Sequence, residues 1–101
     1  MLRLNMHTVV QPESLTAEQR ELVDAASASS GQLCVKVSAS TRGRAVCANR
    51  KLFFDSDDSS VALRYIEAVQ SLVEMQLLRE SGGRANYELT NFGWELSHKL
   101  S

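Results

Sequence analysis

Residues 62–76 carry the most regular pattern in this sequence. Apolar side chains recur there at steps of three and four residues, which is the spacing of one face of an α-helix. These side chains are Ala62, Tyr65, Ile66, Val69, Leu72 and Val73. The opposite face holds Arg64, Glu67 and Gln70, with no pair of opposite charges four residues apart. Burial of the apolar face must therefore stabilise this helix, and the rest of the chain must supply a core for it.

The stretch ahead of this helix has the two-residue period of β-strands. Residues 32–39 alternate apolar and polar side chains, which predicts a half-buried strand. Residues 45–48 and 51–54 predict two further strands. Asn49 and Arg50 between them predict a two-residue hairpin turn, with Arg50 at the position where glycine is preferred. The three strands together predict a small antiparallel β-meander.

Two further helices and a second hairpin complete the predicted elements. Thr16 and Gln19 have the spacing of a capping box, which predicts a helix that begins after Thr16 and ends before Gly31. Residues 77–78 and 85–89 predict two short strands around a loop with two glycines. The last predicted helix is capped by Thr90. Its inner face would consist of Phe92, Gly93, Leu96, Ser97 and Leu100.

The composition is that of one small globular domain. The chain has 101 residues, of which 44% are apolar and 23% charged, and this excludes a disordered tail. We expect an N-terminal arm or edge strand over residues 1–12 and a single domain over residues 13–101. No apolar run approaches the roughly 20 residues that cross a bilayer, and residues 1–11 lack the apolar core of a secretory signal. The expected location is the cytoplasm, without a membrane partner.

The last forty residues resemble the winged-helix domains of prokaryotes. The pattern is a long helix, Leu77-Leu78, a glycine-containing loop, then Tyr87-Glu88-Leu89-Thr90 and Gly93 three residues later. In that family these segments form the recognition helix, the wing and the C-terminal helix. The resemblance covers residues 60–100 and implies an α+β, winged-helix-like fold with about three helices, a small antiparallel β-meander and a β-wing.

The chain departs from the family pattern at two places. The family usually has glycine where the long helix ends, and this chain has Gln76. The family also places a helix-turn-helix before the wing, whereas here a β-meander precedes the long helix. We therefore interpret the chain as a variant module with a sheet inserted between its first and second main helices. Such modules bind either DNA or proteins, and fold alone does not distinguish the two.

Basic residues gather in the predicted meander and wing. No acidic residue occurs between Asp24 and Asp55, whereas five basic residues do. A basic hairpin tip beside a basic wing would contact phosphates. The residues predicted to contact DNA are Arg42, Arg44, Arg50, Lys51, Arg79 and Arg84. The first prediction is therefore a small regulatory module, acting in transcription, that contacts the DNA backbone.

The long helix favours the alternative, a protein-interaction module. A helix that reads bases exposes Arg, Lys, Asn or Gln, but this one exposes Glu67 and Glu74 and follows Asp57 and Asp58. Such a module would be an adaptor or small inhibitor of a larger prokaryotic complex. A contact with a partner, or with a second copy in a homodimer, is predicted to use Leu63, Glu67 and Trp94.

Catalytic and metal-binding motifs are absent from the sequence, so we expect no enzyme, cofactor, metal or small-molecule substrate. A distant third alternative is an enzyme that uses Cys34 or Cys47. Cys34, Cys47, His7 and His98 show no zinc-ligand spacing. Gly82-Gly83 is too short for a phosphate-binding loop. The two cysteines fall in predicted strands and can face each other across a sheet, and we expect them to be reduced thiols.

Overall fold

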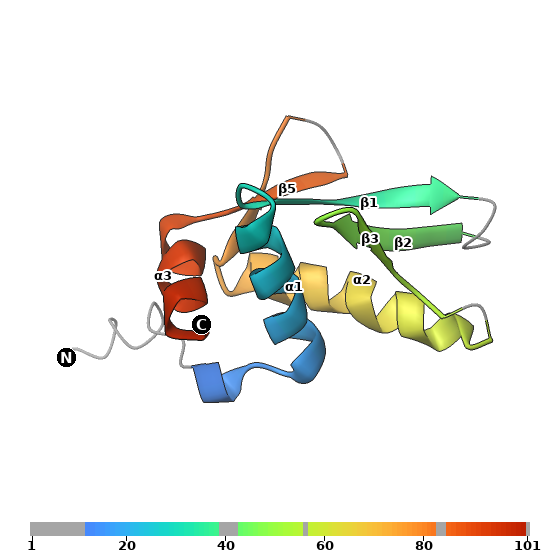
Figure 1. The fold of residues 1–101 in the computed structure, drawn as a ribbon, viewed down its shortest axis with the longest axis horizontal. Helices are drawn as coiled ribbons and strands as arrows, with labels where there is room; N and C mark the ends of the chain where they lie inside the picture. Colours follow the sequence, from blue (N-terminus) through green and yellow to red (C-terminus); the bar gives the residue numbers. More distant parts are fainter. Residues whose placement is uncertain (1–11, 39–42, 56, 83–84, 101) are drawn as a thin grey trace.

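The computed structural model describes residues 12–38, 43–55, 57–82 and 85–100, which contain three α-helices and a five-stranded sheet (Figure 1). In chain order the elements are η2 (Pro12–Ser14), α1 (Ala17–Ala28), β1 (Gln32–Ser38), β2 (Gly43–Ala48), β3 (Lys51–Phe53), α2 (Ser59–Glu74), β4 (Leu78–Glu80), β5 (Asn86–Leu89) and α3 (Asn91–Leu100). The predicted α+β class is confirmed. An arm or edge strand was predicted over residues 1–12, of which residues 1–11 lie outside the described residues. The hairpin tip at 39–42 also lies outside them.

The predicted meander and the predicted wing belong to one sheet. The strand order is β3-β2-β1-β5-β4, and every neighbouring pair is antiparallel. β5 joins the two hairpins because it pairs with β1, where Leu33 lies opposite Tyr87. The β2–β3 turn uses Asn49 and Arg50 with φ values of 53° and 64°, and two left-handed residues are what a type I′ hairpin requires.

The helices pack on one face of the sheet, as Figure 1 shows. Alternate strand residues point toward them, so Leu33, Val46 and Phe53 are buried. α1 contributes Leu22, Val23 and Ala26 to the same core, and α2 contributes Ala68, Val69 and Leu72. The apolar stripe predicted for α2 is confirmed.

α1 and α2 are joined by a buried polar contact as well as by apolar packing. The predicted capping box is present: Thr16 accepts a hydrogen bond from the Gln19 backbone N–H, and the Gln19 side chain accepts one from the Thr16 N–H. The Gln19 amide also donates to the Ser71 hydroxyl at 2.7 Å. One side chain thus caps α1 and fixes it to α2.

α2 ends in a Schellman motif without glycine. The N–H of Leu77 donates to the Leu72 carbonyl, and the N–H of Gln76 donates to the Val73 carbonyl. Gln76 has φ 66°, so it adopts the left-handed conformation that glycine usually provides at this position. Gln76 stands where the sequence pattern above usually has glycine, and its backbone still has the conformation of a helix end.

α3 starts directly after β5 because Thr90 caps it. The Thr90 hydroxyl accepts a hydrogen bond from the N–H of Gly93 and donates one to the carbonyl of Gln76. Gly93 is buried, and a Cβ there would overlap the Leu77 carbonyl oxygen, so glycine permits this close approach. The prediction that Phe92 faces inward is wrong: its side chain is 40% exposed. Phe92 lies in the first turn of α3, and its side chain lines the groove described below.

Candidate functional site

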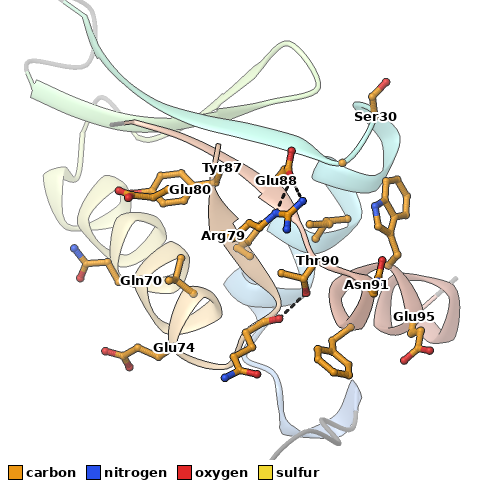
Figure 2. Close-up of a pocket in the computed structure, with 17 residues that line it drawn as sticks. Ser30, Gln70, Glu74, Arg79, Glu80, Tyr87, Glu88, Thr90, Asn91 and Glu95 are labelled. Carbon is orange, nitrogen blue, oxygen red and sulfur yellow. Dashed lines mark hydrogen bonds and ion pairs between the residues drawn. The ribbon is translucent and has the colours of Figure 1, made fainter. Parts of the chain in front are cut away.

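An open groove of about 1340 Å³ lies on the surface of the described part of the chain. Its walls are the C-terminal half of α2, the β4–β5 hairpin and the first turns of α3 (Figure 2). It is lined by Ser30, Gly31, Gln70, Val73, Glu74, Gln76, Leu78, Arg79, Glu80, Tyr87, Glu88, Leu89, Thr90, Asn91, Phe92, Trp94 and Glu95. We refer to this set as the α2–α3 groove.

Two aromatic side chains form the α3 wall of the groove. Phe92 is exposed, and Trp94 is half-buried against Gly31, which ends the turn after α1. Gly31 has φ 83°, so its backbone takes a conformation that side chains disfavour, and it leaves space for the indole ring. The partly buried Val73 and Tyr87 continue the apolar surface on α2 and β5. The groove therefore offers apolar surface next to solvent.

The charged side chains of the groove are mostly acidic. Glu74 from α2, Glu80 from β4 and Glu95 from α3 are exposed around it. Among the described residues that line it, Arg79 is the only basic one, and its guanidinium forms an ion pair with Glu88 on the adjacent strand. Hydrogen bonds from Arg79 and Ser81 hold the pKa of Glu88 below its usual value. The Arg79 charge is thus matched, and the three other carboxylates leave the groove negative.

The exposed face of α2 extends this surface beyond the groove. Leu63, Glu67, Gln70 and Glu74 are all exposed, and their spacing of four, three and four residues aligns them in one stripe. Leu63 is the most exposed large apolar side chain in the described part of the chain, at 54%. Two residues of the predicted interface, Leu63 and Glu67, therefore lie on the same stripe of α2 as Gln70 and Glu74, which line the groove. The third, Trp94, lies on the α3 side of the groove.

Four of the six residues predicted to contact DNA, Arg44, Arg50, Lys51 and Arg79, lie in the described part of the chain. Arg42 and Arg84 lie outside the described residues. Lys51 forms an ion pair with Glu21 on α1 at 3.2 Å, and its Nζ lies 5.0 Å from the ring centroid of Phe53.

Arg44 and Arg50 are both exposed, but β2 separates them. Arg44 follows the first residue of that strand, whereas Arg50 lies in the turn after its end. A strand advances about 3.3 Å per residue, so the length of β2 keeps the two guanidinium groups at different ends of the sheet.

Among the residues the structure describes, no cluster of three His, Cys, Asp or Glu side chains is arranged to hold a metal ion. No helix in the described ranges is both long and apolar enough to span a bilayer.

Sequence reasoning missed the groove as a whole. The sequence predicted Trp94 and Glu67 as interface residues, but it gave no sign that Glu80, Tyr87 and Glu95, which come from three different elements, lie around one groove. Their proximity depends on β5 pairing with β1 and β4 and on α3 packing against α1 and β5. Comparisons of the chain with known protein families, with curated proteins and with solved structures gave no match.

Proposed function

We propose that this chain is a non-catalytic, winged-helix-like module that binds a positively charged protein segment in the α2–α3 groove. The observation that carries the proposal is the groove itself. It combines exposed aromatic surface with three carboxylates, and the one basic residue among its described lining residues, Arg79, is paired. Acidic rims attract basic partners and orient them, whereas apolar surface supplies the affinity.

The topology supports the winged-helix part of the proposal. The β4–β5 hairpin follows α2 in the chain. Its strand β5 pairs with β1, the strand that follows α1. The helix α3 follows the hairpin directly, as the C-terminal helix does in that family. The β2–β3 hairpin occupies the position between β1 and α2 where the family has a further helix, so a standard helix-turn-helix is not formed there.

Electrostatics favours a protein over DNA as the partner. The helix that corresponds to a recognition helix presents Glu67 and Glu74, which repel phosphate. Two of the basic residues expected to contact DNA, Lys51 and Arg79, are engaged with carboxylates of this chain. Phosphate contact by these two side chains would compete with their ion pairs.

A fluorescence titration tests the proposal directly because the chain has one tryptophan, Trp94, and it lines the groove. The probe is a 15-residue peptide of lysine and leucine with the leucines on one helical face. A peptide of glutamate and leucine in the same pattern is its control. We expect the cationic peptide alone to change Trp94 emission, with an affinity that falls as salt is added.

Charge-reversal variants separate groove binding from general attraction to an acidic protein. Glu74→Lys and Glu95→Lys alter the groove, whereas Asp24→Lys makes the same charge change at an exposed position of α1 outside it. We expect the groove variants to weaken binding about tenfold or more and the control to change it about twofold or less. Equal effects at all three positions would contradict the proposal. Binding of duplex DNA with a steep salt dependence would replace it by the DNA-contact function.

A further inference from the structure

Cys34 and Cys47 lie directly opposite each other on the neighbouring strands β1 and β2. Both are free and half-buried. Because they occupy opposite positions of paired strands, their side chains project from the same face of the sheet. They are the only cysteines in the sequence.

The backbone at this point has a spacing that a disulfide can bridge. The N–H of Val35 donates to the Ala85 carbonyl, so the polar backbone groups of Val35 point toward the side of the sheet that carries β5. Backbone groups alternate along a strand, and those of Cys34 therefore point toward β2. Cys34 and Cys47 thus form a hydrogen-bonded antiparallel pair, in which the Cα atoms lie about 5.5 Å apart. Disulfides span Cα separations of about 4.4–6.8 Å but need Cβ atoms about 3.5–4.5 Å apart. The Cβ atoms of a hydrogen-bonded pair lie near the upper end of a range of about 4.5–5.5 Å, so the two strands must move closer for the bond to form. The resulting disulfide is strained and therefore readily reduced.

Cys34 and Cys47 lie on the sheet face that points away from the helices. Leu33 and Val46, their respective neighbours in the chain, are buried in the core on the other face. The thiols therefore do not belong to the core, and their bridging does not require the core to repack. Burial and the neighbouring Cys47 raise the pKa of Cys34, an effect that Lys36 partly opposes.

We propose that Cys34 and Cys47 form a thiol–disulfide exchange site, which low-molecular-weight disulfides of the glutathione type oxidise to a bond that ties β1 to β2. In the first step one cysteine thiolate attacks a sulfur of the glutathione disulfide. A mixed disulfide forms and one glutathione leaves as a thiolate, which takes up a proton. The second cysteine, as its thiolate, then attacks the mixed disulfide and releases the second glutathione. One disulfide forms, one is reduced, and the two thiol protons pass to the two glutathione molecules.

The test follows the intact mass and the free thiols of the full chain in glutathione buffers of increasing oxidation. We expect the wild-type protein to lose two thiols together and about 2 Da in mass as a monomer, reversibly on addition of dithiothreitol. The variants Cys34→Ser and Cys47→Ser should instead each gain one glutathione, because neither has a second thiol to displace it.

Phenylarsine oxide provides a second measurement that needs no oxidation. This arsenical binds stably to two thiols only when both reach the same arsenic atom. We expect it to bind the wild-type chain one to one and to bind neither single variant. Wild-type protein that carries two glutathiones without an internal disulfide would overturn the proposal, as would disulfide-linked dimers in place of the 2-Da loss.

Discussion

The indole of Trp94 packs so closely on Gly31 that a Cβ atom at residue 31 would lie 2.6 Å from the Trp94 Cζ2 atom. This contact joins the turn after α1 to the first turns of α3, and it sets the position of an aromatic wall of the α2–α3 groove.

Gly31→Ala should therefore destabilise the protein through two effects. Alanine resists the left-handed backbone of residue 31, at about 1 kcal/mol, and its methyl group collides with the indole, at about 1–3 kcal/mol. Gly82→Ala is a matched control, because Gly82 has φ 67° but open space around it. Urea unfolding should show a loss of about 2–4 kcal/mol for the first variant and about 1 kcal/mol for the second. Similar losses would mean that the Trp94 contact does not constrain residue 31.

The left-handed residue at the end of α2 predicts a stabilising substitution. Gln76→Gly should raise the free energy of unfolding by about 0.5–1 kcal/mol, because glycine adopts the φ of 66° without strain. Gln70→Gly is the control: it lies inside α2, also exposed, and should lower stability by about 1 kcal/mol. Thermal unfolding of both variants measures the difference. Destabilisation by Gln76→Gly comparable to that of Gln70→Gly would contradict this account of the helix end.

The hydrogen bond from Tyr65 to Glu21 predicts a dependence of stability on alkaline pH. Burial, then this hydrogen bond and the charge of Glu21, raise the pKa of Tyr65 to about 12. The pKa of tyrosine in the unfolded chain is about 10. The neutral phenol is therefore favoured by folding, so its stabilisation is complete below pH 10 and is lost as the pH rises from about 10 to about 12.

Tyr65→Phe should remove that stabilisation, about 1 kcal/mol for a half-buried hydrogen bond to a carboxylate. We expect urea unfolding to show this difference between wild type and variant at pH 8 and to show little difference near pH 12. A constant difference across this range would show that the hydroxyl contributes through packing alone.

The acidity of the groove predicts how ions quench the fluorescence of Trp94. Carboxylates from Glu74, Glu80 and Glu95 concentrate cations and repel anions at short range. Caesium should therefore quench the folded protein more effectively than iodide at low ionic strength, and added sodium chloride should reduce the difference. In Glu95→Gln the preference for caesium should become weaker. Stronger quenching by iodide in the wild type would contradict the description of this groove as negative.

Much of the secondary structure was predictable because it follows from rules that act over a few residues. The Thr16–Gln19 capping box, the apolar stripe of α2 and the Asn49–Arg50 turn each depend on side chains or backbone preferences within one turn. The opposition of Cys34 and Cys47 also follows from strand alternation once the hairpin is placed. Phe92 was misplaced because periodicity identifies the faces of a helix but not where the helix protrudes beyond its neighbours.

The sequence by itself determined the helices, the strands and the polar caps that delimit them. Only the tertiary structure decided that β5 pairs with β1, that Arg79 is matched by Glu88 and Lys51 by Glu21, and that α3 packs on α1 so that a groove lies between α3 and α2. The pairing of Lys51 with Glu21 spans 30 residues and the contact of Gln19 with Ser71 spans 52. Contacts at such separations depend on how the apolar faces of several elements pack together, and no local pattern encodes that arrangement.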